Sequence, residues 1–205
     1  MAKRNAFTLA EVLITLGIIG VVAAMTLPTL LTSTQAAQFR AQVKKTLAVS
    51  SQAIVVNLAM DDFDAGTTTT TSYGHDTDGV PNASLINIFS DRLQVLNKGG
   101  AITAAEAWTV NGSSNSANYT LFLNDGSAVT FPKTCQANSE ASPCKGVIDV
   151  NGRKKPNLVA TCDSGSNDND CKVKKAYDQY PIQIYDQTIR PGNPGARYVI
   201  FKAGK

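Results

Sequence analysis

Two patterns of apolar residues follow one another in the first sixty residues: a continuous apolar run up to about residue 31, and a periodic pattern after it. Between Phe7 and Leu31 almost every position is apolar, and Glu11 carries the only charge. As a helix rising about 1.5 Å per residue, this stretch is longer than the roughly 30 Å hydrocarbon core of a bilayer. The pattern therefore predicts a transmembrane helix over residues 7–31.

From residue 32 to residue 62 the apolar positions become periodic. They recur at steps of three and four residues, with one longer gap near Ser50 and Ser51, while polar and basic residues fill the other side. The apolar positions are Ala36, Phe39, Val43, Leu47, Ile54 and Leu58. A free coiled-coil stalk would need sustained heptads, which are absent. We therefore expect the helix to continue over residues 32–62 as an amphipathic half that packs on a soluble domain.

Residues 63–205 alternate short apolar runs with turns, which predicts one extracytoplasmic domain of the α+β class with a small antiparallel sheet. Residues 66–81 are expected to form an exposed, mobile loop, and Ser84 to cap a short helix that turns Leu93 and Leu96 inward. The expected strands are residues 119–123 and 127–131 around an Asn-Asp-Gly turn, 146–150, and a final hairpin of 181–189 with 196–202.

Charge suggests an orientation rather than a ligand. The formal net charge is +3, and loss of Lys3 and Arg4 with the first six residues would lower it to about +1. This balance is not the electrostatic footprint of a nucleic-acid-binding protein. Positive charge ahead of an apolar span keeps that end cytoplasmic, so the domain is predicted to face outward.

Glu11 is the anomaly in the apolar span. An ionisable group there costs about 2.5–3.5 kcal/mol on insertion scales, and residues 7–31 contain no Lys or Arg to pair with it. Cleavage after Ala6 would create a cation, the amine of Phe7, at a suitable depth. At about 4 Å and an effective dielectric near 20, the two charges would attract by about 4 kcal/mol. Pairing between staggered copies does not close, so it predicts a filament rather than a ring.

Residues 6–11, AFTLAE, resemble the cleavage and methylation motif of type IV prepilins and type II secretion pseudopilins. The resemblance implies cleavage by a prepilin peptidase between Ala6 and Phe7, N-methylation of Phe7, and use of Glu11 in assembly. Pro28 matches the helix-kinking proline of many such subunits. The family usually has Gly where this chain has Ala6, so we expect slower rather than absent processing.

The resemblance also implies partners and a location. The partners would be further copies of this chain, other pilins, the prepilin peptidase and an inner-membrane assembly platform. The precursor would lie in the bacterial inner membrane as a single-pass protein. The mature subunit would then enter an extracellular pilus or a periplasmic pseudopilus.

Two simpler interpretations compete for the same stretch. A secretory signal peptide has an apolar core of about 7–15 residues, which is shorter than this one and does not explain Glu11. An ordinary single-span anchor explains the length but leaves Glu11 unpaired. Gly17, Gly20 and Ala23 indicate close helix packing in lipid, which is compatible with either a filament or an anchor.

The four cysteines predict disulfides. Eight residues separate Cys135 from Cys144, and eight separate Cys162 from Cys171. Neither spacing is that of a zinc site, and an even count in an outward-facing domain indicates two bridges. Three connectivities are possible, and the two local ones are favoured. Each would stabilise the domain by roughly 2.5–3 kcal/mol in the chain-entropy model.

No catalytic constellation is visible, so the sequence predicts a protein that is not an enzyme. His75 is the only histidine, and no serine or cysteine triad can be built around it. No cofactor is predicted. The alternative is Ca²⁺, either at residues 76–79 or at the carboxylates of residues 163–170, although ordinary polar turns explain both segments. A DNA contact at Lys172, Lys174 and Lys175 is a further alternative to a solvated basic face.

Together these features favour a structural subunit of a type IV pilus or related filament, with a pilin-like fold. Within the family, the alternatives are a pseudopilin of a type II secretion system and a minor or competence pilin. The alternative from another class is a membrane-anchored binding domain that does not polymerise.

Overall fold

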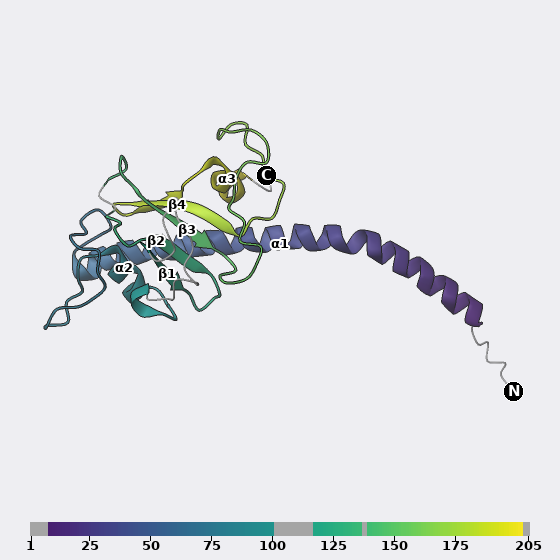
Figure 1. Cartoon of the computed structure of the whole chain (residues 1–205), viewed down its shortest axis with the longest axis horizontal. Helices are drawn as coiled ribbons and strands as arrows, with labels where there is room; N and C mark the ends of the chain where they lie inside the picture. The colour runs from purple at the N-terminus through teal and green to yellow at the C-terminus, as the bar shows by residue number, and fades with distance from the viewer. Residues whose placement is uncertain (1–7, 101–116, 137–138, 203–205) are drawn as a thin grey trace.

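The structure is a computed structural model that describes residues 8–100, 117–136 and 139–202. One helix dominates it. Helix α1 (Leu9–Asp61) is 53 residues long; its C-terminal half lies against the domain and its N-terminal half projects away from it (Figure 1). The predicted boundary between the membrane half and the amphipathic half therefore falls inside a single continuous helix.

The domain is built on a five-stranded antiparallel sheet in the order β1-β2-β3-β4-β5. Each strand pairs with the next in the sequence, so the sheet is a simple meander. The predicted hairpin around Asn124–Gly126 and the predicted strand near residue 146 are both present. The strands are β1 (Asn118–Phe122), β2 (Ala128–Pro132), β3 (Cys144–Asp149), β4 (Gln179–Tyr185) and β5 (Thr188–Pro191).

The sheet register defines two ends of the domain. Ala128 pairs with Asp149, and Asp149 pairs with Gln179, so the β1–β2 turn, the loop 150–158 and the segment 171–178 leave the sheet at one end. Lys45 of α1 forms an ion pair with Asp125 of that turn at 3.0 Å. We call this the near end, because α1 projects from it.

The far end lies at the opposite edge of the sheet. There the β4–β5 turn passes Asp186, whose carbonyl accepts a hydrogen bond from the Ala65 amide just after α1 ends. The loop between α1 and α2, residues 66–83, extends beyond this end, on the side of the molecule opposite to the N-terminus (Figure 1).

The core lies between the sheet, α1 and the short helix α2 (Leu85–Arg92). Ser84 caps α2 as predicted, since its hydroxyl accepts a hydrogen bond from the Asn87 amide. The most deeply buried large side chains come from all of these elements. They include Val43, Ile54, Leu85, Ile88, Phe89, Leu121, Phe131, Ile148, Tyr180, Ile182 and Ile184.

Three local predictions were wrong. Leu96 is 72% exposed because α2 ends at Arg92 and the chain continues in an extended conformation from Leu93. Residues 66–81 do not form a fully exposed loop. Thr68 is buried, and the amides of Thr69 and Thr70 donate to the carbonyl of Ala83.

The third wrong prediction concerns the C-terminal strand. Residues 196–202 do not form a strand: helix α3 (Pro194–Arg197) and the single π-helical turn η3 (Tyr198–Lys202) follow β5. Asn193 caps α3 through its side chain, and Pro194 occupies the first turn, where its missing N–H is tolerated. The hairpin turn falls earlier, at Asp186, whose φ of 46° is left-handed.

Candidate functional site

The N-terminus of α1 is closed by a capping box. Thr8 is the N-cap: its hydroxyl accepts from the Glu11 amide at 3.3 Å. In return, one carboxylate oxygen of Glu11 accepts from the Thr8 amide and the Thr8 hydroxyl, both at 2.8 Å. Two backbone donors at the start of the helix are thereby satisfied. The charge of Glu11 thus lies in the first turn of α1, beside Thr8. If the chain is cleaved after Ala6, Thr8 becomes its second residue.

The sequence interpretation missed this local role of Glu11. The signal was present, because a Thr followed three residues later by a Glu is the pattern of a capping box. Glu11 therefore has an intrachain partner as well as the intersubunit one that the charge argument predicts.

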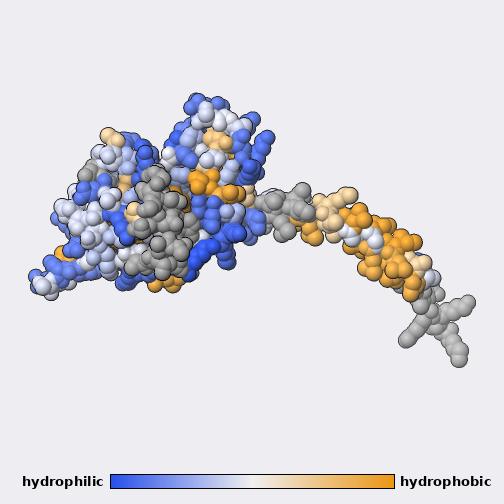
Figure 2. Space-filling model, in the orientation of Figure 1, coloured by the Kyte–Doolittle hydropathy of each residue, from blue (hydrophilic) through white to orange (hydrophobic). Residues whose placement is uncertain are grey.

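The N-terminal half of α1 is exposed all round. From Leu9 to Leu27 every side chain is exposed except that of Ala23, which is partly covered. Among the residues that the structure describes, this is the one helical stretch long and apolar enough to cross a membrane. Figure 2 shows it as a hydrophobic arm attached to a largely hydrophilic domain. Exposure of this much apolar surface would be unfavourable in water and is expected only where lipid or other helices surround it.

The C-terminal half of α1 buries a stripe that is partly polar. Val43 and Ile54 are fully buried, as the periodicity predicts. Thr46 and Asn57 are buried in the same stripe: the Thr46 hydroxyl donates to the Ser127 hydroxyl at 3.2 Å, and the Asn57 side-chain amide donates to the Phe63 carbonyl at 2.9 Å. Ser50 is also buried, and it fills the gap that interrupts the apolar period.

The outer side of the same half is more apolar than an ordinary surface helix. Val49, Val55 and Met60 are 40%, 49% and 67% exposed, and Ala59 is exposed beside Met60. Exposed polar and basic residues between Ser33 and Lys45 separate this side from the projecting half. α1 therefore presents two separate apolar surfaces to whatever surrounds it.

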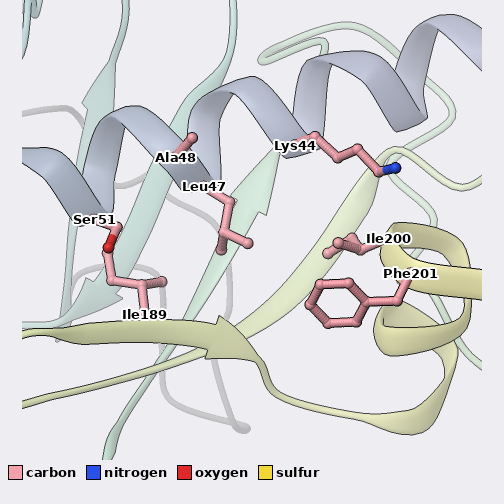
Figure 3. A pocket seen from close by; sticks show the side chains of 7 residues that line it. All are labelled: Lys44, Leu47, Ala48, Ser51, Ile189, Ile200 and Phe201. Carbon is pink, nitrogen blue, oxygen red and sulfur yellow. The ribbon is translucent and has the colours of Figure 1, made fainter.

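A groove of about 400 Å³ runs between α1 and the C-terminal segment. Figure 3 shows its two walls, with Leu47 and Ala48 of α1 on one side and Ile200 and Phe201 of η3 on the other. Lys44 lies at one edge with its amine directed outward. The groove is lined mainly by carbon, and it contains no carboxylate or histidine that would suggest catalysis or metal binding.

The processing residues lie partly outside the described structure. Ala6 and Phe7 are not among the described residues, so cleavage and methylation there remain predictions. At Pro28 the backbone stays helical, and α1 curves along its projecting half without a break (Figure 1). Its role in assembly stays a prediction.

The structure joins Cys135 to Cys144 and Cys162 to Cys171, the two local links that the sequence favours. The Cα atoms are 5.6 and 5.3 Å apart, within the ordinary range for disulfides. The first bridge ties the loop after β2 to the start of β3. The second closes the loop that precedes β4.

The carboxylates of the second disulfide loop are directed to donors of the protein itself. Asp163 accepts from the amides of Lys174 and Lys175 and from the Tyr177 hydroxyl, and the first of these bonds is the main cause that lowers its pKa. Asp170 accepts from the Asn167 amide, which lowers its pKa in the same way. Calcium binding by this loop therefore stays a prediction, as does a DNA contact by the nearby lysines.

Two buried carboxylates meet at the near end of the sheet. Asp149 and Asp178 are both almost completely buried. Asp178 accepts from the amides of Asn157 and Leu158, while Asp149 accepts from Gln179 at 2.9 Å. Burial, reinforced by the charge of Asp178, raises the pKa of Asp149 to about 6. This pair shapes the loop 150–158 rather than forming an open site.

His75 lies 3.1 Å from Asp91, which also accepts from Tyr73. This arrangement holds the loop 66–83 to α2. Within the described ranges no group of three or more His, Cys, Asp or Glu side chains is placed to hold a metal ion.

Residues 1–27 match the family model described as the prokaryotic N-terminal methylation motif. The chain carries the N-terminal signature of type IV pilins and pseudopilins. The motif supports a pilin-type subunit that is processed at its N-terminus, and with the apolar helix it fits a membrane-anchored precursor. Comparison with curated proteins and with solved structures gave no match.

The layout of the chain agrees with this signature. A long N-terminal helix, apolar in its first half, is followed by a short helix and a five-stranded antiparallel sheet. This is the α+β, pilin-like arrangement that the sequence predicts. Pilin-type proteins are typically structural rather than catalytic.

Proposed function

We propose that this protein is a structural subunit of a type IV pilus or a related filament. A prepilin peptidase would cleave it between Ala6 and Phe7, and Phe7 would then be N-methylated. The mature subunit would leave the bacterial inner membrane and pack its α1 helix against those of other copies. Its work is mechanical, and no catalytic step is assigned to it.

One observation carries the proposal: from Leu9 to Leu27 every side chain of α1 except that of Ala23 is exposed, and this apolar stretch bears one carboxylate, Glu11, near its tip. A plain anchor needs the apolar surface, but it gains no more from Glu11 than the hydrogen bonds to Thr8. In a bundle of staggered copies, the same carboxylate can meet the free amine of a neighbouring Phe7. The proposed pairing would offset the cost of placing Glu11 in lipid, and it would set the stagger between neighbours.

The capping box supplies a second explanation for Glu11, and the two can be separated. Gln also serves at the third position of a capping box, so Glu11→Gln keeps the hydrogen bond to the Thr8 amide but removes the charge. Glu11→Val removes both. If pairing with the amine matters, both variants insert into the membrane, are cleaved, and assemble poorly. If capping alone matters, Glu11→Gln assembles like the wild type.

Thr8→Val provides the matched control. It removes the N-cap hydroxyl but leaves the carboxylate of Glu11 available for a neighbour. We expect loss of helix stability at the tip, of about 1 kcal/mol, with filaments retained. Loss of filaments from Thr8→Val together with normal filaments from Glu11→Gln would contradict the pairing mechanism.

Processing is tested directly by mass spectrometry of the protein recovered from cells and from sheared surface material. We expect a mature chain that begins at N-methylated Phe7. Microscopy of the same material, with the share of filament mass contributed by this protein, measures assembly. An intact Met1–Ala6 leader on surface protein, with no filaments, would favour a membrane-anchored domain that does not polymerise.

A further inference from the structure

The far end of the domain carries four exposed carboxylates, and Lys133 and Lys145 are also exposed on this side of the sheet. Asp62 terminates α1, and the carbonyl of Asp186 accepts a hydrogen bond from the Ala65 amide, three residues beyond Asp62. The loop beyond them carries Asp76 and Asp78 at its tip. All four carboxylates are exposed, and none forms an ion pair within the part of the chain that the structure describes.

The near end is basic. Its exposed lysines come from three separate segments that the sheet register and the Lys45–Asp125 ion pair bring to one place: α1, the loop 150–158 and the segment 171–178. Most of the acidic groups at this end are already engaged, since Asp125 pairs with Lys45 and Asp168 with Arg197. The near-end lysines that form no ion pair among the described residues are Lys44, Lys154, Lys155, Lys172 and Lys174.

The loop that bears Lys154 and Lys155 is held in place. Gly152 adopts a φ of 64° and packs so closely on Gly126 that a Cβ there would lie 2.6 Å from its carbonyl oxygen. The Asn151 side chain donates to the Lys155 carbonyl, and Asp178 accepts from two amides just beyond. The two lysines are therefore presented on a preorganised loop rather than on a free strand.

The two charged ends are too far apart to neutralise each other in one molecule. Along α1, Lys44 and Asp61 are separated by about 25 Å at the helical rise, and screening at physiological salt acts over about 8 Å. The unpaired near-end lysines therefore cannot reach the far-end carboxylates of the same molecule, and a second molecule is needed to bring them together.

We infer that the near end of one subunit contacts the far end of another copy of this chain, displaced along the filament axis by about the length of the domain. The contact pairs the lysines of the loop 150–158 with carboxylates around Asp62 and Asp186. It is a head-to-tail interface between domains, separate from the packing of the α1 helices.

This inference rests on the proposed filament, because parallel membrane anchors make all copies point the same way. Copies side by side without a displacement would place lysines beside lysines and carboxylates beside carboxylates, which is unfavourable. A displacement by one domain length instead places the near-end lysines of one copy opposite the carboxylates of Asp62 and Asp186 in the next. The interface is heterologous and does not close on itself, as a filament requires.

Charge reversal at the two ends tests the contact. Lys154→Glu with Lys155→Glu, and separately Asp62→Lys with Asp186→Lys, are each expected to lower the yield of sheared filaments by about fivefold or more. The four changes combined should restore most of the yield, because opposite charges face each other again. The matched control is Lys98→Glu with Lys145→Glu: it changes the net charge as the near-end pair does, at exposed lysines away from the near end.

Leader cleavage and thermal unfolding of each variant show whether a loss of filaments reflects misprocessing or misfolding. Rescue by the combined variant, with little effect of the control, supports the inference. Filaments unchanged in both reversed variants would overturn it while leaving the proposed function intact. Loss at the near end alone, without rescue, would also overturn it and indicate a different anionic partner. A wild-type chain that forms no filaments would remove both proposals.

Discussion

The two halves of α1 are one continuous helix in two different surroundings. From Leu9 to Leu27 the sequence is apolar on every side, and the structure leaves every side exposed. From Val43 to Asn57 the helix buries one stripe, and that stripe contains Thr46, Ser50 and Asn57 as well as aliphatic residues. The more apolar half is thus the less buried one, which is the pattern of a helix that lipid or other helices surround. The half within the domain packs its buried stripe against the sheet and α2.

The largest expected difference between the halves concerns packing within the chain. Ile54 is fully buried, so Ile54→Ala should lower the free energy of unfolding of the domain by about 2–5 kcal/mol through lost burial and a cavity. Val55 is the next residue and lies on the exposed side, so Val55→Ala should lower the free energy of unfolding by less than about 0.5 kcal/mol. Thermal unfolding of the disulfide-intact chain in detergent measures both. Equal effects at the two positions would mean that the stripe is misassigned.

Insertion into a membrane should depend on the projecting half of α1 and not on the half that packs in the domain. Ile18→Asp should oppose insertion by about 2.5–3.5 kcal/mol and lower the membrane-bound fraction, while the domain keeps its unfolding temperature. Val56→Asp places the same charge on the exposed side of the domain half, outside the span, and should leave insertion unchanged. Membrane fractionation compares the two. Normal insertion of Ile18→Asp would contradict the transmembrane assignment.

The next largest expected effect is on the pH dependence of stability, which should differ between the folded domain and the projecting half of α1. Burial raises the pKa of Asp149 from its ordinary 3.8 to about 6, so the folded domain holds this proton more tightly than the unfolded chain does. The stability gained from the proton is complete below pH 3.8 and is lost as the pH rises through 6. Asp149→Asn should therefore stabilise the domain above pH 7 by about 1–3 kcal/mol, and the gain should shrink as the pH falls towards 4.

Gln179 can turn its side-chain amide to accept from the new Asn, which makes the substitution tolerable in place. Unfolding temperatures of wild type and variant across this pH range measure the effect. Membrane insertion of the apolar half should not change with pH over the same interval. A gain from Asp149→Asn that is constant at all pH values would argue against a raised pKa.

The smallest effect concerns the polar stripe itself. The buried Ser50 hydroxyl has no hydrogen-bond partner among the described residues, unlike Thr46 and Asn57. Ser50→Ala removes an unsatisfied buried group and should raise the free energy of unfolding by about 1 kcal/mol. Asn57→Ala, which removes a satisfied group and leaves the Phe63 carbonyl without its donor, should lower it. A loss of stability in Ser50→Ala would show that its hydroxyl has a partner.

Much of this architecture was predictable from local patterns. The apolar run and its charge predicted the projecting helix, and three- and four-residue steps predicted that Val43 and Ile54 would be buried. Turn chemistry predicted the hairpin around Asn124–Gly126, and cysteine spacing favoured the disulfide pairing. Each of these signals involves residues close together in the sequence, where propensity and periodicity apply directly.

The failures share a physical reason. Leu96 was expected inside because it follows the period of α2, but Leu93 leaves the helix and redirects the chain. The run 196–202 has the composition of a strand, yet the cap at Asn193 starts a helical turn that packs beside α1. In both places a single residue at a junction decided the direction of the chain, and apolar content does not encode direction.

The sequence by itself determined that this chain has an apolar helix long enough to cross a membrane, carries the N-terminal methylation motif and holds one carboxylate in that helix. These properties depend on local order along one segment. The tertiary structure alone decided which polar residues of α1 are buried, and it alone gathered lysines and carboxylates at opposite ends of the domain. Residues as distant as Lys154 and Lys174 lie at one end of the domain because the register of the sheet places them there, and no local pattern specifies that register.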